Sequence, residues 1–551
     1  MPPVNRKPAQ TKKRRDFSLV IVAGITVAIT AGIGAFVWWR RSITQGGGFP
    51  AIAQVVPANA QVVVAFNTDS DTWNSLGQFG SSESRQIIAQ AIVQSPLSLL
   101  VKQGKLDFAQ DIQPWIGDRV VTALVPVPNA PPATLIIASS TDGSKSQAFL
   151  EKYRSAMTAQ GANFTEKNAD GFAYFVSPSN DNNVSIVTAH IDNRYVAIAS
   201  NEAVMQQLFT IYRSRQGSLA QKELFVRTQT VPTQIPNPLV QIYLDGSIEV
   251  PNLNLPAPTR AKIQAVTASV GVQREGLRWE IDTHLQSPQD NIQVSSNQIL
   301  KAIPESAFLV ITGNNLTQSW QSLHEQSQGN PTSQQFVSQL KQGIKDATGW
   351  DVEQDLLPWT TGEFAVVLVA DKQGILTNTG FGLALLLQTS DPNATKSAMA
   401  KLDSKVRETR GGLFPQGVEV KSTGELTTWQ VGSTVVASRG VTAQGLVLWT
   451  MGELHQQFLP TPARPLPDTP LWQLLTSQLS SATGGYFYLH ITSALALLES
   501  RLPPEVKANP TYQQTRTVLD SIEGIAATST RVTDRTARLE ILFTLKPIPA
   551  R

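Results

Sequence analysis

The hydrophobic pattern of the chain begins with 22 residues, 18–39, that carry no charged side chain. A helix rises about 1.5 Å per residue, so this length crosses the ~30 Å hydrocarbon layer of a bilayer. Trp38 and Trp39 close the stretch, where interfacial aromatic residues are found. We therefore predict one transmembrane helix over 18–39, because no later apolar stretch approaches this length.

A different pattern follows residue 50. Short apolar runs such as 61–66, 119–125 and 364–370 are typical of strands, and the periodicity of 144–157 is typical of a helix. Turn signals such as 168–171, Asn-Ala-Asp-Gly, predict hairpins between neighbouring strands. The pattern predicts an α+β fold, with antiparallel sheets and helices packed on one face.

The pattern also occurs twice. Five segments recur in the same order: 57–66 with 304–313, 105–123 with 349–367, 195–209 with 445–459, 218–225 with 465–472, and 276–285 with 536–545. Five matches in order indicate two tandem copies of one domain. The predicted organisation is a basic cytoplasmic tail (1–17), a transmembrane anchor (18–39), a Gly-rich tether (40–50), a first α+β repeat domain (51–290), a linker (291–300) and a second α+β repeat domain (301–547).

Charge orients the predicted anchor. Residues 1–41 hold eight basic residues and one acidic residue, which leaves 37 basic and 41 acidic residues in the rest of the 551-residue chain. The positive-inside rule places the N-terminus in the cytoplasm and the body across the membrane. The slightly acidic body excludes the basic face that nucleic-acid binding needs, so we predict no nucleic-acid partner.

Two features of the N-terminal region leave alternatives open. Residues 14–19, Arg-Arg-Asp-Phe-Ser-Leu, are similar to a twin-arginine export signal, and Ala-Ile-Ala at 51–53 could be a cleavage site that yields a mature end at Gln54. We favour an uncleaved anchor, because its apolar run is longer than the core of a usual signal peptide. Gly24, Ala28 and Gly32 lie four apart, as in helix-packing motifs, although a small-residue-rich anchor explains them equally.

The segments 105–123 and 349–367 share an acidic, aromatic phrase, which we call the repeated phrase. Two interpretations are open: its carboxylates act as acid, base or metal ligands, or its residues shape the chain. We favour the structural one, in which an aspartate caps a helical turn, proline ends it, tryptophan is buried under the sheet and glycine permits a sharp bend. The residues concerned are Asp107, Asp111, Pro114, Trp115, Gly117 and Asp118, and Asp351, Asp355, Pro358, Trp359, Gly362 and Glu363.

Other chemistry is sparse. The chain has no cysteine, which excludes thiolate sites and disulfides. The five histidines have no metal-ligand spacing, and no phosphate loop or nucleophile elbow occurs. Ser338 and Lys341 form an Ser-x-x-Lys pattern, which arises often by chance on a helix. We predict no catalytic, cofactor-binding or metal-binding residue.

The anchor, the phrase "LDFAQDIQPWIGD" and the segment "SLAQKELF" make the chain resemble cyanobacterial single-pass membrane proteins that carry the domain of unknown function DUF3352. The second copy departs from that pattern with "PWTTGE" and "LPDTPLW". The resemblance covers nearly all of residues 50–547 and implies a body in the periplasm or thylakoid lumen. It implies no activity and no catalytic residue.

The predicted function is that of a membrane-anchored extracytoplasmic scaffold, assembly factor or binding protein without catalytic activity. Its predicted partners are the lipid bilayer, through the N-terminal helix, and other envelope or membrane proteins. One alternative is binding of a small molecule, lipid or peptide in a cleft between the two copies, because pockets favour domain boundaries. A less favoured alternative is an envelope hydrolase that uses carboxylates or the Ser338/Lys341 pair.

Overall fold

A computed structural model describes most of the body of the protein. The described residues are 48–84, 104, 106–178, 185–246, 261–288, 295–327, 334–335, 337–339, 341–342, 345, 351–360, 362–389, 391–408, 417–481 and 484–547. The predicted tail, the anchor and nearly all of the tether lie outside these residues, and so do Gly24, Ala28 and Gly32. Within the described ranges, no helix is long and apolar enough to cross a membrane.

One continuous antiparallel sheet of 20 strands is the central element of the fold. We call residues 48–288 the first half and residues 295–547 the second half. The strands of the first half are β1 (Val62–Asn67), β2 (Ile116–Val127), β3 (Ala130–Ser140), β4 (Thr165–Ala169), β5 (Phe172–Pro178), β6 (Ser185–Ile191), β7 (Tyr195–Ala199), β8 (Val240–Asp245), β9 (Ile263–Gln273) and β10 (Gly276–Leu285). Those of the second half are β11 (Ala307–Gly313), β12 (Phe364–Ala370), β13 (Phe381–Leu387), β14 (Glu419–Thr423), β15 (Leu426–Val431), β16 (Thr434–Val441), β17 (Val447–Met451), β18 (Tyr486–His490), β19 (Ile522–Thr533) and β20 (Thr536–Leu545).

Helices and helical turns connect the strands. In the first half they are α2 (Gly48–Ile52), α3 (Ser70–Asn74), η1 (Ser75–Gln78), η2 (Phe108–Ile112), α6 (Gly143–Thr158), α7 (Glu202–Ser214), η3 (Leu219–Gln221) and α8 (Glu223–Gln229). In the second half they are η4 (Gln298–Ala302), α10 (Leu316–Ser327), η5 (Val352–Leu356), η6 (Leu357–Trp359), η7 (Gly374–Leu376), α12 (Pro392–Glu408), α13 (His455–Phe458), η8 (Leu466–Asp468), α14 (Pro470–Thr476), α15 (Ile491–Glu499), α16 (Pro504–Lys507) and α17 (Pro510–Asp520).

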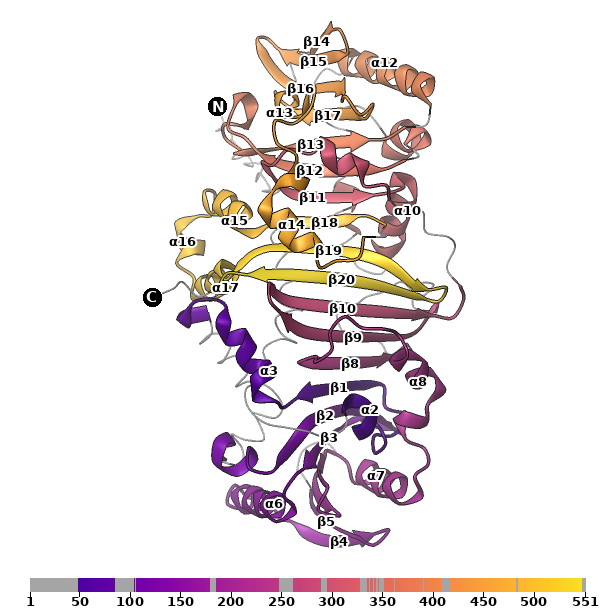
Figure 1. Ribbon diagram of the computed structural model, residues 1–551, viewed down its shortest axis with the longest axis vertical. Helices are drawn as coiled ribbons and strands as arrows, with labels where there is room; N and C mark the ends of the chain where they lie inside the picture. Colours follow the sequence, from indigo (N-terminus) through magenta and orange to yellow (C-terminus); the bar gives the residue numbers. More distant parts are fainter. Residues whose placement is uncertain are drawn as a thin grey trace, which may run out of the picture.

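The strands form a ladder along the long axis of the molecule, with β4 at one end and β14 at the other (Figure 1). The pairings give the spatial order β4-β5-β6-β7-β3-β2-β1-β8-β9-β10-β20-β19-β18-β11-β12-β13-β17-β16-β15-β14. Outward from the β10–β20 seam, the first half reads 10-9-8-1-2-3-7-6-5-4, and the second half reads the same when ten is subtracted from each label. Isolated bridges also correspond, because Pro57 pairs with Ser218 and Pro304 pairs with Pro465.

The turns between strands follow the local signals of the sequence. Asp170 and Gly171, between β4 and β5, both have positive φ, as do Asp192 and Asn193 between β6 and β7. Aspartate, asparagine and glycine tolerate this left-handed backbone better than other residues. The hairpin predicted at 168–171 is confirmed by the β4–β5 pairing, and the β6–β7 pairing forms a second hairpin at the other turn.

Helices cover both faces of the sheet, and the prediction of one covered face was wrong. Val63 and Ala65 of β1 join a core that α2, α7 and α8 close. Phe66 of the same strand joins a second core on the opposite face, with residues of α3 and α6. Successive strand side chains point to opposite faces, so a strand whose residues are all apolar is covered on both sides. The mixed α+β class and the antiparallel pairing agree with the prediction.

Candidate functional site

In the first half, two aspartates of the repeated phrase accept hydrogen bonds from backbone amides of the same phrase. Asp107 accepts a hydrogen bond from the amide of Gln110 (2.9 Å), and Asp111 Oδ2 accepts one from the amide of Asp107 (2.8 Å). Each aspartate therefore satisfies an amide at the start of the turn η2, as a reciprocal cap does. Lys152 of α6 then pairs with Asp111 at 2.6 Å.

The second half repeats these contacts. Asp351 accepts hydrogen bonds from the amides of Glu353 (3.0 Å) and Gln354 (3.3 Å), and Asp355 Oδ2 accepts one from the amide of Asp351 (3.0 Å). Two lysines of α12 pair with this carboxylate, Lys401 at 3.1 Å and Lys405 at 2.7 Å. The second aspartate of each phrase thus ties its turn to the helix that follows β3 or β13.

These contacts set the charge of the two aspartates. Although burial opposes the shift, hydrogen bonds from Lys405, the Asp351 amide and Lys401 hold the pKa of Asp355 at about 2. Against the same opposition, Lys152 and the Asp107 amide lower the pKa of Asp111. A carboxylate held ionised by lysines is a poor general acid at neutral pH.

Both tryptophans of the phrase are buried, which confirms the prediction. Trp115 is 2% exposed and Trp359 is 8% exposed. Their indole Nε1–H groups donate to the carbonyl oxygens of Asp111 (2.6 Å) and Asp355 (2.8 Å), so neither ring buries an unsatisfied donor. Ile112 is also buried beside the turn. The phrase holds one large ring against the sheet in each half.

The glycines act differently from the prediction. Neither Gly117 nor Gly362 has a positive φ, so neither is needed for a left-handed bend. A Cβ at Gly117 would collide with the side chain of Ser139, and one at Gly362 would lie 2.8 Å from Gln388 Oε1. Close approach of the neighbouring strand therefore explains both glycines. The turn η2 ends at Ile112, two residues before Pro114, as predicted, whereas in the second half η5 is followed directly by the turn η6, which contains Pro358.

The last acid of the phrase has different surroundings in the two halves. Burial raises the pKa of Asp118, against the effects of Arg119 and a hydrogen bond with Ser139. Glu363 is 6% exposed and accepts hydrogen bonds from Ser295 Oγ (2.6 Å), Ser296 Oγ (2.8 Å) and the Asn297 amide (2.8 Å). Burial opposes the shift, but these donors lower the pKa of Glu363. The last acid of the phrase is thus a partly buried carboxylate whose charged form is disfavoured in the first half, and a cap for residues 295–299 in the second.

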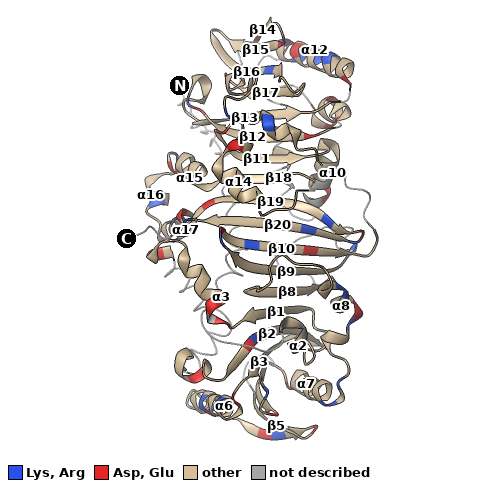
Figure 2. Ribbon diagram, viewed as in Figure 1, with Lys and Arg blue, Asp and Glu red and all other residues tan. Residues whose placement is uncertain are grey.

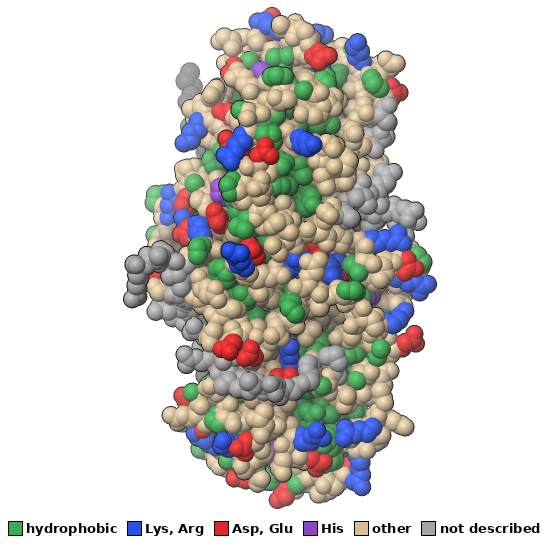
Figure 3. All heavy atoms as spheres, viewed as in Figure 1, with side chains coloured by type: hydrophobic (Ala, Val, Ile, Leu, Met, Phe, Trp, Pro, Cys, Tyr) green, Lys and Arg blue, Asp and Glu red, His purple; other side chains and the backbone are tan. Residues whose placement is uncertain are grey.

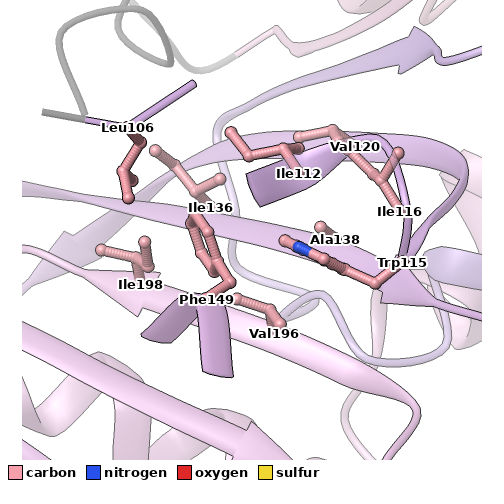
Figure 4. Close-up of a pocket in the computed structure, with 10 residues that line it drawn as sticks. All are labelled: Leu106, Ile112, Trp115, Ile116, Val120, Ile136, Ala138, Phe149, Val196 and Ile198. Carbon is pink, nitrogen blue, oxygen red and sulfur yellow. The ribbon is translucent and has the colours of Figure 1, made fainter. Parts of the chain in front are cut away.

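A small apolar cavity of about 20 Å³ lies under the phrase of the first half. Figure 4 shows Trp115 and Phe149 facing it, with Ile136 and Ile198 from the strands and Leu106 at its margin. A cavity of this size has room for about one water molecule. No polar side chain apart from the indole of Trp115 lines it, so it offers no group for acid, base or metal chemistry.

The remaining candidates also lack partners for catalysis. Ser338 is exposed, and Lys341 pairs with Glu353 at 2.8 Å. The hydrogen bond that Lys341 donates to Glu353 raises the pKa of Lys341, which keeps the amine protonated and unable to accept a proton. No group of three or more metal-ligating side chains occurs among the residues the structure describes.

A buried charge cluster at the β10–β20 seam is the most unusual set of side chains in the described body. Strands β10 and β20 pair so that Glu280 lies directly opposite Glu540. Side chains two apart share one face of a strand, so this register gathers five charged residues on one face. We call them the seam cluster, and each is 7% exposed or less: Arg278, Glu280, Asp282, Arg538 and Glu540.

The arginines of the seam cluster cross between the halves. Arg278 reaches Glu540 at 3.2 Å, and Arg538 reaches Glu280 at 3.4 Å. Arg538 also holds Asp282 through two nitrogens, at 2.7 and 2.8 Å. Although burial opposes it, the hydrogen bonds and charge of Asp282 raise the pKa of Arg538. Figure 2 shows these oppositely charged residues on the two central strands.

Each glutamate of the seam cluster also fixes a loop of its own half. Glu280 accepts hydrogen bonds from Thr233 Oγ1 (2.7 Å) and the Gln234 amide (3.1 Å). Glu540 accepts from the amide of Ser480 (2.7 Å) and its hydroxyl (2.9 Å). Buried charges are tolerated when they are paired and hydrogen-bonded in this way.

A polar cavity of about 100 Å³ lies next to the seam cluster in the first half. Glu280 and Asp282 line it, together with Thr267, Ser269 and Gln241. In the second half Leu542 stands at the same strand position as Asp282, counted from the opposed glutamates, and belongs to the apolar core. The two halves therefore differ here in side-chain chemistry.

The sequence contains a signal for the seam cluster, although its local pattern does not indicate burial. Arg-x-Glu occurs in both closing strands, and Glu280 and Glu540 align between the copies. Alternating charged and apolar residues in a strand usually indicate a solvated face, so the pattern suggested no buried site. Only the pairing of β10 with β20, and the loops that carry Thr233 and Ser480, bury these charges.

Comparisons place the chain among known proteins. No curated protein matches its sequence. Among solved structures, crystal form III of TP0453 has 12% identity and a TM-score of 0.27, covering 43% of this chain and 81% of that chain. Crystal form IV of TP0453 has 12% identity and a TM-score of 0.25, covering 43% of this chain and 83% of that chain. The family model described as "Protein of unknown function (DUF3352)" matches residues 20–545, so the chain belongs to this family.

Proposed function

We propose that this protein is a membrane-anchored extracytoplasmic scaffold, assembly factor or binding protein without catalytic activity. The observation that carries the proposal is the unbroken 20-stranded sheet. At about 4.8 Å between strands, it provides a platform roughly 90 Å long. Asp111 and Asp355 of the repeated phrase and the charged groups of the seam cluster are engaged in internal ion pairs.

We also propose that the platform is two copies of one domain, with the boundaries that the sequence suggests. The shared strand order, the corresponding bridges and the matching contacts of Asp111 and Asp355 support this interpretation. The halves are not separate lobes, because β10 and β20 pair directly. A duplicated domain joined edge to edge doubles the length of the surface it presents.

The proposed location is the periplasm or thylakoid lumen of a cyanobacterium, with the N-terminus in the cytoplasm. The apolar stretch 18–39 and the basic residues before it support this orientation. In sealed vesicles with the cytoplasmic side outwards, added protease should remove only a tag at residue 1. Cleavage of the body before the vesicles are opened would contradict the proposal.

The scaffold hypothesis is tested by cross-linking in intact membranes followed by mass spectrometry. We expect the same partner protein in independent preparations. The face in Figure 3 carries interspersed lysine, arginine, aspartate and glutamate, which suits a protein partner better than a polyanion. Recovery of the protein only as an unattached monomer would count against a scaffold.

A second candidate function is binding of a small molecule in the first half, beside the seam cluster. The 100 Å³ cavity beside Glu280 and Asp282 favours this hypothesis, and its size accommodates a small polar molecule better than a lipid or peptide. Native mass spectrometry of the purified chain should then show a bound mass that Ser269→Leu, which fills the cavity, removes. An unchanged mass spectrum in that variant would exclude the cavity as the site.

A further inference from the structure

Strand β10 is complementary to itself as well as to β20. In the present seam, Glu280 lies opposite Glu540, and the residues on either side of this pair are matched antiparallel around it. Two antiparallel β10 strands that met at the same point would place Glu280 opposite Glu280 of the second copy. The same register would place Arg278 opposite Asp282 of the second copy, and Asp282 opposite its Arg278.

The self-pairing would contain one more direct ion pair than the present seam. Arg538 now faces Asp282 and holds it through two nitrogens, whereas Arg278 faces Leu542. In a β10–β10 pair, both arginines would face an aspartate. The other face would also match, because Trp279 now faces Ile541 and would face Ile281 of the second copy.

Arg278 pairs with Glu280 from the same strand and would move with it, whereas the ion pair that Arg538 makes with Glu280 would be lost. Thr233 and Gln234 donate to Glu280 from the loop after α8. The first half also has an apolar core of its own on that face, built from residues between Phe49 and Ala265. On the opposite face, Leu277 and Trp279 pack with Ile541 and Phe543 of the second half, and Ile281 of the second copy would take the place of Ile541 opposite Trp279.

We propose that β10 is a self-complementary pairing edge, and that a second copy of this chain takes the place of β20 when the seam opens. The resulting dimer has two-fold symmetry, with each copy contributing the same patch. This interaction surface goes beyond the proposed scaffold function and does not depend on it. Two copies of the chain would then form one symmetric dimer.

Two matched variants separate the two pairings. Asp282→Arg places like charges opposite Arg538 within the chain and opposite Arg278 of a second copy, so it weakens both pairings. The double variant R278E/D282R still weakens the internal seam, because residue 278 then approaches Glu540 and residue 282 approaches Arg538. Between two copies, however, the reversed charges face each other in complementary pairs, so only the self-pairing is restored.

Cross-linking reads the register of the dimer directly, because the natural chain has no cysteine. Leu277 and Thr283 would lie opposite each other only between copies; within the chain they face Phe543 and Ala537. Full-length chains carrying Leu277→Cys are mixed with chains carrying Thr283→Cys and oxidised. We expect the mixed disulfide dimer in R278E/D282R to exceed that in Asp282→Arg by roughly tenfold.

Each outcome decides the proposal. A mixed dimer that forms in the double variant and not in the single variant supports self-pairing. Equal yields in the two variants would show collisional cross-linking and overturn it. Absence of the mixed dimer from both would also overturn it, since an opened seam then leaves β10 without a second copy. Size-exclusion chromatography with light scattering confirms that the cross-linked species contains two chains.

Discussion

The repeated phrase and the seam cluster both repeat charged residues between the halves, but they differ in burial. The side chain of Lys152 is 52% exposed where it pairs with Asp111. At the seam, by contrast, the side chains of Arg278 and Glu540 are each 1% exposed. A water-exposed pair is screened and contributes little, whereas a buried charge that loses its partner is costly. The more conspicuous sequence repeat is therefore not the place where charged side chains contribute most to stability.

The largest expected effect is at the seam. Arg278→Ala leaves Glu540 with one charged partner fewer and should lower the free energy of unfolding by about 3–5 kcal/mol. Urea denaturation followed by circular dichroism measures it. Arg535, exposed on the turn before β20, is the matched control, and its replacement by alanine should stay within about 0.5 kcal/mol. Similar losses in the two variants would contradict the distinction between buried and exposed charge.

The next effect compares the last acid of the phrase in the two halves, where the expected changes have opposite signs. Glu363→Gln removes a charged acceptor of several hydrogen bonds and should cost about 1.5–3 kcal/mol at pH 7. Burial raises the pKa of Asp118, so its charged form is disfavoured in the fold, and Asp118→Asn should leave stability unchanged or slightly higher. Thermal unfolding of both variants at pH 7 checks the difference. Losses of equal size would show that the two carboxylates have the same role.

The pH dependence compares the two capping aspartates. A carboxyl group whose pKa is lowered by folding stabilises the protein above its unfolded pKa, and this stabilisation is lost as the pH falls through the folded value. For Asp355 the loss falls between pH 3.8 and about 2. Asp355→Asn should therefore flatten the stability curve over that range, and Asp111→Asn should do so less. Urea midpoints at several acidic pH values measure both, and an equal flattening would be the contrary result.

The smallest expected effect is at the exposed partner of the phrase. Lys152→Ala removes the ion pair with Asp111 and should cost only about 0.2–1 kcal/mol, an effect that 1 M salt should reduce further. Lys405→Ala is the comparison in the second half, where Lys401 still pairs with Asp355. A loss above about 2 kcal/mol in Lys152→Ala would show that the exposed pair of the phrase contributes as much to stability as a buried pair of the seam.

Part of the fold followed directly from local signals. The run 119–125 lies inside β2, and the run 364–370 coincides with β12. Continuous apolar runs favour strands that are covered on both faces. The capping role of Asp107 and Asp351 and the burial of Trp115 were also predicted. The reason given for Gly117 was wrong, because the nearby side chain of Ser139 comes from another strand and leaves no local signal.

The strands, caps and turns could be predicted from the sequence, since each depends on residues that lie close together along the chain. The repeated segments are visible in the sequence directly. Tertiary structure alone decided that the halves share one sheet and that Glu280 meets Glu540. A one-residue slip in that register would move every charged side chain of β10 to the other face. Register between distant strands is set by packing and pairing over the whole sheet, so a repeated Arg-x-Glu became a buried seam only when the chain had folded.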